Sequence, residues 1–211
     1  MKCLYIDTSS SYLYTALVED NKLLAEVKEE YGQSLSEVAL PRIVSMFEKN
    51  KLEPRDIDKI IVVNGPGSFT GIRIGLTIAK VYSWGLSIPI TTIYSLEAMA
   101  LSSKENTIHV PMINARRGFV FAGIYDNSCK PLLKPQHIKL ENLLKELKGI
   151  GNYKVITNDE FSDFPNTEKY DPDILKIVDH FKDKKSINAH AVNPEYLKLT
   201  EAEEKKLWLK K

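Results

Sequence analysis

Two stretches of the sequence, far apart in the chain, carry the same order of residue types. Residues 6–7 read Ile-Asp and, four residues later, residues 12–20 read Tyr-Leu-Tyr-Thr-Ala-Leu-Val-Glu-Asp. At an offset of 107 positions, residues 113–114 read Ile-Asn and residues 119–127 read Phe-Val-Phe-Ala-Gly-Ile-Tyr-Asp-Asn. Two unrelated hairpins could share strand alternation by chance, but the ungapped match through both strands and the loop favours a duplicated fold.

The duplication divides the chain into two predicted units. The polar stretch 102–106 separates them, so we expect a first lobe over 1–103 and a second over 104–190. Hairpins over 3–19 and 110–126 should then superpose. The remainder, 191–211, forms a tail, for which we consider packing against the first lobe.

The hydrophobic pattern outside the hairpins alternates between strands and helices. After a three-strand meander, it predicts an α/β architecture in which each lobe has a mixed sheet flanked by helices. The predicted strands cover 2–7, 12–19, 22–28, 58–64, 89–94 and 153–157, and the predicted helices cover 36–50, 71–86, a short turn from Ser95, 140–147 and 172–181. Ser36 and Ser95 are the expected helix caps. Residues 158–170 are expected to form a loop.

Composition excludes several classes of protein. The 211 residues carry 29 basic and 28 acidic side chains, a balance that argues against a strongly basic nucleic-acid wrapper and an acidic disordered tail. No apolar run approaches the about 20 residues of a membrane span, and the first residues are too mixed for a signal peptide. The two cysteines are too few for a disulfide framework or a zinc site. We therefore expect a cytoplasmic protein with reduced thiols and no membrane partner.

Only two loops carry groups that could bind a ligand. The glycine-rich segment 64–75 follows a predicted buried strand and opens a helix, where backbone N–H groups can bind an anion. It fits neither the P-loop nor the G-x-G-x-x-G pattern, and its glycines equally suit a tight turn. Asp7 could act in a metal–phosphate site or accept hydrogen bonds within its turn. The weak cofactor-binding candidates are Asp7, Thr8, Ser68 and Gly71, and the sequence shows no catalytic constellation or metal-ligand spacing.

The two longest predicted helices, 36–50 and 71–86, have more apolar residues than one buried face requires. Either a second apolar face contacts a partner chain, or other parts of the chain cover these helices. We predict a partner interface that forms a four-helix contact, with Gly75 allowing close approach. Its predicted residues are Leu40, Val44, Phe47, Ile74, Gly75, Ile78, Val81 and Tyr82.

Four motifs together resemble those of one protein family. They are Ile6-Asp7-Thr8 with its hairpin, the segment 64–75, Ala115-Arg116-Arg117-Gly118, and the tail segment 194–203. This combination resembles the bacterial TsaB family, also called YeaZ. The resemblance implies an actin-like (ASKHA) duplicated fold and a role in forming threonylcarbamoyladenosine (t6A) at position 37 of tRNA. It further implies a non-catalytic subunit that dimerises with and activates the catalytic subunit TsaD. The ATPase TsaE then joins a ternary complex, the chain alone forms a homodimer, and tRNA contact is indirect or unassigned.

A second hypothesis is a stand-alone actin-like nucleotide-binding hydrolase or a glycoprotease-like enzyme. Such enzymes need a phosphate-binding lysine or a metal-binding histidine pair, and the sequence shows neither at the expected places. This difference favours the non-catalytic subunit, with no cofactor and with weak or absent nucleotide affinity.

Overall fold

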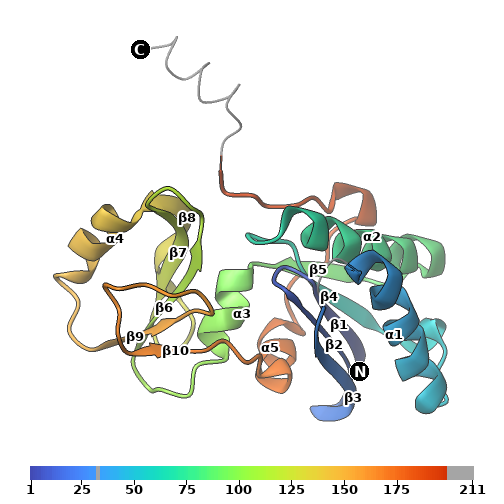
Figure 1. The fold of residues 1–211 in the computed structure, drawn as a ribbon. Coiled ribbons are helices and arrows are strands. Elements are labelled where there is room, and N and C mark those ends of the chain that lie inside the picture. The colour runs from blue at the N-terminus through green and yellow to red at the C-terminus, as the bar shows by residue number, and fades with distance from the viewer. Residues whose placement is uncertain (32–33, 199–211) are drawn as a thin grey trace.

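The chain forms two five-stranded sheets (Figure 1). The computed structural model describes residues 1–31 and 34–198. In the first sheet the strands lie in the order β3 (Lys22–Glu30), β2 (Tyr12–Glu19), β1 (Lys2–Asp7), β4 (Lys59–Val63) and β5 (Ile90–Ile93). In the second sheet the order is β8 (Pro131–Lys139), β7 (Phe119–Tyr125), β6 (Ile108–Asn114), β9 (Tyr153–Ile156) and β10 (Thr167–Glu168).

The two sheets have the same topology. In each sheet a three-strand antiparallel meander comes first, and two further strands then add in parallel beside its first strand. This correspondence confirms the predicted duplicated α/β fold. Two mixed sheets with flanking helices in this order define the actin-like architecture.

The helices repeat less completely than the strands. In the first half, α1 (Leu35–Lys49) precedes β4, α2 (Phe69–Leu86) precedes β5 and α3 (Ser95–Leu101) follows it; in the second, α4 (Leu140–Leu147) precedes β9 and α5 (Ile174–Phe181) follows β10. The segment between β9 and β10 holds no helix, so α2 has no counterpart in the second half. Short 3-10 turns cover Pro54–Asp56 and Ala189–Ala191. We call the first sheet with α1 and α2 the first lobe, and the second sheet with α4 the second lobe.

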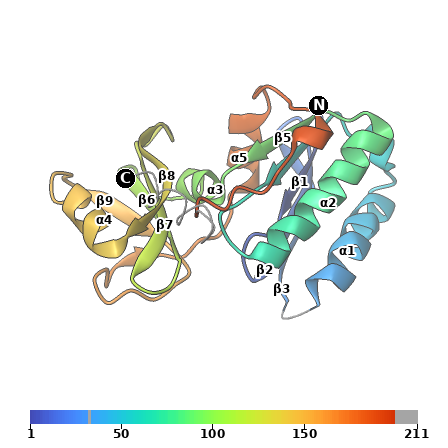
Figure 2. The same cartoon turned by 90° about the horizontal axis from the view of Figure 1, so that it is seen from above.

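Strand alternation sends side chains of β1 into two different cores. Leu4 and Ile6 pack in the outer core under α1 and α2, which lie side by side on the first sheet (Figure 2). Cys3 and Tyr5 point the other way, into a core that also contains residues of α3, α5 and the second sheet. Figure 1 shows α3 and α5 between the two sheets. The two lobes therefore share one central core.

The predicted helix caps are wrong in both places. Helix α1 begins at Leu35 after Ser34, and Ser36 lies inside the helix. Helix α3 begins at Ser95, with Tyr94 as its N-cap, and the backbone N–H of Tyr94 donates to the Glu97 carboxylate (2.9 Å). Both helices start earlier because apolar residues just inside their first turns are buried, which outweighs the preference for a serine cap.

The second hairpin is one residue tighter than the sequence match implies. Ile6 pairs with Thr15, whereas Ile113 pairs with Phe121 rather than with Ala122. The ungapped offset of 107 therefore holds for β1 and β6 but fails by one residue across the turn. The short strand β10 also lies within the stretch that the sequence predicted as a loop.

Residues 192–198 run along the first lobe. The backbone N–H of Glu195 donates to the Asn64 carbonyl (2.8 Å), and the Arg73 Nε donates to the Tyr196 hydroxyl (2.8 Å). The Tyr196 ring stacks on Phe69 with centroids 5.1 Å apart. The remaining tail, 199–211, lies outside the described residues. The lobe limits at 103 and 190 stay a prediction. Among the helices that the structure describes, none is long and apolar enough to cross a bilayer.

Candidate functional site: the cleft between the lobes

A cleft of about 700 Å³ opens where the strand ends of the two sheets face each other. Its first-lobe wall consists of the serines that follow β1, the glycine-rich loop that follows β4, and Ser95. Its second-lobe wall contains Asn114, Arg116, Phe121, Asn158 and Asp159. In open α/β sheets, ligands bind in such crevices beyond the carboxyl ends of strands, so this cleft is the candidate site.

The glycine-rich loop packs directly on the turn after β1. The Ser68 backbone N–H donates to the Ser9 carbonyl (2.7 Å), and the Thr8 hydroxyl donates to the Gly71 carbonyl (2.7 Å). A Cβ atom at Gly67 would overlap the Ser9 carbonyl, and one at Gly71 would overlap the Thr8 carbonyl. Close backbone approach therefore explains both glycines. The Ser68 hydroxyl caps α2 by accepting from the Gly71 N–H (3.2 Å).

The structure brings all four candidate residues together, but it turns Asp7 away from solvent. Asp7 is buried, and its Oδ1 accepts hydrogen bonds from the Ser9 N–H (2.8 Å) and the Ser9 hydroxyl (2.7 Å). Its Oδ2 accepts a hydrogen bond from the Tyr170 hydroxyl (3.4 Å). Burial raises the pKa of the Asp7 carboxyl, and the hydrogen bonds from Ser9 offset part of that rise. Both oxygens of Asp7 are thus engaged within the protein.

Tyr170 is the site residue that sequence reasoning missed. It belongs to the segment between β10 and α5, which crosses from the second lobe to the central core. Its ring meets Tyr14 edge-on, with centroids 5.7 Å apart. No motif surrounds Tyr170, because its role depends on a contact with a residue 163 positions away.

The second-lobe wall is held by local hydrogen bonds. The Asn114 N–H donates to Asp159 Oδ2 (2.7 Å), and the Arg116 N–H donates to the Asn114 side-chain oxygen (2.8 Å). Arg116 is the basic side chain among the described residues that line the cleft. In the described part of the chain, no group of three or more His, Cys, Asp or Glu side chains is placed to hold a metal ion. The cleft can thus accommodate a small polar molecule, with a single guanidinium for an anionic group.

The predicted interface residues divide into three groups by exposure. Leu40, Val44 and Val81 are exposed on the outer surface of α1 and α2, at 45%, 39% and 62%. Ile74, Ile78 and Tyr82 are half-buried between the two helices.

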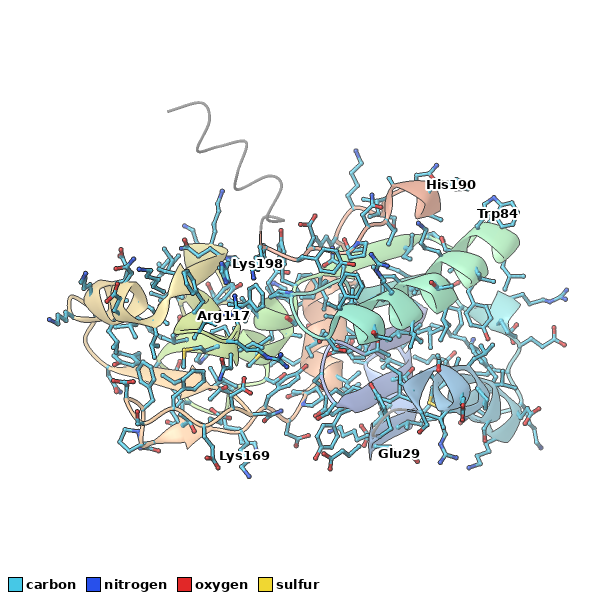
Figure 3. All side chains as sticks on the ribbon, turned by 45° about the horizontal axis from the view of Figure 1, so that its top comes forward. Glu29, Trp84, Arg117, Lys169, His190 and Lys198 are labelled. Carbon is cyan, nitrogen blue, oxygen red and sulfur yellow. The ribbon has the colours of Figure 1, made fainter. Side chains whose placement is uncertain are left out.

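Phe47 and Gly75 are corrections to the predicted interface, because both face the interior. Phe47 packs in the outer core, and a Cβ at Gly75 would overlap the Thr8 hydroxyl of the same chain. Gly75 thus allows close approach within the chain. The prediction missed Trp84, which is 70% exposed and lies edge-on to the His190 ring at the far end of α2 (Figure 3).

Comparisons with known proteins agree with this architecture. A family model described as "TsaD: tRNA N6-adenosine threonylcarbamoyltransferase" matches residues 24–178. Two structures from Pseudomonas aeruginosa superpose over 93% of this chain and 99% of their own. They are a protein with similarity to peptidase YEAZ (TM-score 0.77, 18% identity) and YeaZ (TM-score 0.74, 17% identity). At this identity they show the fold. The fold and the cleft therefore define an actin-like protein of the threonylcarbamoyltransferase class.

Sequence relatives narrow the class further. The chain is 31% identical to the tRNA threonylcarbamoyladenosine biosynthesis protein TsaB of Bacillus subtilis, over 97% of both chains. It is 28% identical to the Escherichia coli protein of the same name, over 72% of this chain and 71% of that protein. The chain belongs to the TsaB family.

Proposed function

We propose that this protein is a subunit of the machinery that forms threonylcarbamoyladenosine in tRNA. Its relatives bear the name of that pathway, and the matching family model bears the name of the transferase. The subunit acts by binding and activating a TsaD protein and carries no catalytic step of its own. A TsaE protein joins the pair in a ternary complex.

The engaged state of Asp7 is the observation that carries the non-catalytic role. An actin-like nucleotide site needs a free carboxylate at the end of β1 to hold the metal–phosphate group. Here both carboxylate oxygens accept hydrogen bonds from the protein, and Asp7 is 1% exposed. Opening the site would require breaking these bonds. Nucleotide affinity of the isolated protein should therefore be weak or absent.

The outer surface of α1 and α2 supports the partner role. Exposed apolar side chains on two adjacent helices, such as Leu40, Val44 and Val81, leave water when a matching helix pair packs on them. Two such pairs form a four-helix contact. The protein alone uses the surface for a homodimer, and this homodimer competes with the TsaD complex.

Reconstitution tests the proposal. TsaD, TsaE and the threonylcarbamoyl-adenylate synthase are incubated with ATP and a tRNA that reads ANN codons, with and without this protein. Modified tRNA is then quantified by mass spectrometry. We expect modification to depend on this protein. Equal modification without it would contradict the proposal.

A second measurement separates the alternative of a stand-alone hydrolase. Calorimetry with ATP should show no binding in the micromolar range. Micromolar binding that disappears in Asp7→Ala, together with ATP turnover by the protein alone, would favour the hydrolase instead.

A further inference from the structure

The turn between β6 and β7 carries two arginines in an unfavourable backbone conformation. Arg116 and Arg117 have positive φ angles of 66° and 53°, and Gly118 follows at 75°. Left-handed backbone suits glycine and asparagine, and a long side chain there is disfavoured. Both arginines are exposed, and neither belongs to an ion pair among the described residues. The turn therefore presents two adjacent cations at a conformational cost, a pattern typical of functional positions.

Aromatic rings lie immediately beside this turn. The Phe119 ring stacks on the His137 imidazole with centroids 4.6 Å apart and planes 8° apart. Phe121 meets the same imidazole at 5.3 Å. Phe121 packs at the edge of the central core, whereas Phe119 lies beyond it and is half-buried. These rings form a continuous aromatic platform on one face of the second sheet.

The platform continues into the cleft and extends away from the α1–α2 surface. Phe121 and Arg116 both line the cleft, so the platform and the cations reach its rim. Lys139, an exposed cation, is the strand partner of Phe119. Figure 3 shows Arg117 over the second lobe and Trp84 at the far end of the first lobe. A ligand on the platform therefore leaves the α1–α2 surface free for a protein partner.

We propose that Arg116, Arg117, Phe119, Phe121 and His137, together the β6–β7 surface, bind single-stranded RNA. The inference rests on the proposed function, which makes a tRNA the substrate of the complex. Guanidinium groups pair with phosphates, and aromatic side chains on a sheet face stack on unpaired bases. A duplex hides the faces of its bases, so the surface suits a loop rather than a stem. The cleft beside the platform offers room for an unstacked base.

Binding to a fluorescently labelled anticodon stem–loop RNA tests the electrostatic half of the surface. The full chain, alone and with TsaD, is titrated at several salt concentrations, with a fully paired RNA duplex as comparison. The variant Arg116→Asn/Arg117→Asn removes two cations but suits the left-handed turn. Its fold should be at least as stable as the wild type, while its affinity for the stem–loop falls. The salt dependence should lose a slope of roughly 1.4, about 0.7 for each phosphate contact.

The variant Phe119→Leu tests the stacking half. It keeps an apolar side chain outside the central core, so the fold should survive. Loss of one stacked base lowers RNA affinity by roughly 5- to 150-fold. The salt dependence should stay unchanged, because no charge is removed.

Lys51→Asn is the matched control. Lys51 is exposed, directly follows α1 and also has a positive φ angle of 54°. This substitution removes a cation from a left-handed position outside the β6–β7 surface. RNA affinity should not change.

Several outcomes would overturn the inference. Unchanged stem–loop affinity in both surface variants would do so, as would an equal loss in Lys51→Asn or equal binding of the duplex. A surface variant that weakens TsaD binding and leaves RNA binding intact would identify a protein interface instead. The proposed function fails separately, when the wild-type protein does not support tRNA modification while Arg-dependent RNA binding remains.

Discussion

The hydroxyl of Tyr170 donates a hydrogen bond to Oδ2 of Asp7 across 163 positions of the chain. Asp7 ends the first strand of the first lobe, and Tyr170 follows the last strand of the second. The carboxylate at the mouth of the cleft is therefore tied to the opposite lobe rather than directed at a ligand.

Asp7→Asn should stabilise the protein at neutral pH. Burial raises the pKa of Asp7 in the folded state, so the ionised carboxylate opposes folding above that pKa. The stability contributed by the protonated form is present below the unfolded pKa and is lost as the pH rises through the folded pKa. An asparagine stays neutral and still accepts from Ser9. We expect a gain on the order of 1 kcal/mol at pH 7, measured by urea denaturation.

The same titration between pH 3 and 7 provides the control. The wild type should lose stability relative to Asp7→Asn as the pH rises through this window. A constant difference between the two proteins would contradict the assignment to Asp7.

Two glycine substitutions in α2 should have opposite signs. Gly71→Ala places a Cβ against the Thr8 carbonyl, so we expect a loss of about 1–3 kcal/mol. Gly85→Ala adds a Cβ where no atom lies within 4 Å, so helix propensity should dominate with a gain of about 0.5–1 kcal/mol. Thermal denaturation of both variants checks this. A stable Gly71→Ala protein would mean that the two loops are not in contact.

Both cysteines should resist thiol reagents in the folded protein. Burial raises the pKa of Cys3 to about 11 and that of Cys129 to about 12. At pH 8, roughly a thousandth of Cys3 is thiolate, and thiolate is the reactive form. Ellman's reagent should detect no thiol before urea is added and two thiols afterwards.

The same shifts predict a pH effect on stability. Because the folded pKa values are raised, the thiols' contribution to stability is complete below the unfolded value near 9 and falls at higher pH. Rapid labelling of either cysteine under native conditions would show that its site opens readily.

Val81→Glu should prevent association without unfolding the chain. Val81 is exposed, so the substitution should change stability by no more than about 0.5 kcal/mol. In an apolar helix contact, the buried carboxylate should weaken homodimer and TsaD binding by roughly tenfold or more. Size-exclusion chromatography and pull-down measure both. Leu132→Glu is the matched control, because Leu132 is 56% exposed on β8 of the second lobe. Equal loss in both variants would place the interface elsewhere.

Much of the fold was predictable because its signals are local. Alternating apolar residues set the meander strands, and the fully apolar run 59–63 indicated a strand buried on both faces, as β4 is. Interface candidates were only partly predictable. Periodicity identifies two apolar helices but does not say which residues the sheet covers, so Phe47 and Gly75 were misplaced.

The contacts that define the cleft were not predictable. Tyr170 lies in a segment without regular pattern, and its partner Asp7 is fixed only when the two lobes assemble. The one-residue difference between the hairpins escaped notice for a related reason. Residue types match equally well on either register, and hydrogen bonding in the turn decides the pairing.

The central core has a consequence for how the chain folds. Tyr5 and Tyr14 of the first sheet, Tyr125 and Ile156 of the second, and the helices α3 and α5 all belong to it. Neither repeat can complete its apolar packing alone, because each supplies one wall of the same interior. A duplication that began as two copies of one unit has thus become a single cooperative folding unit. A fragment cut at 103/104 would expose that interior and aggregate.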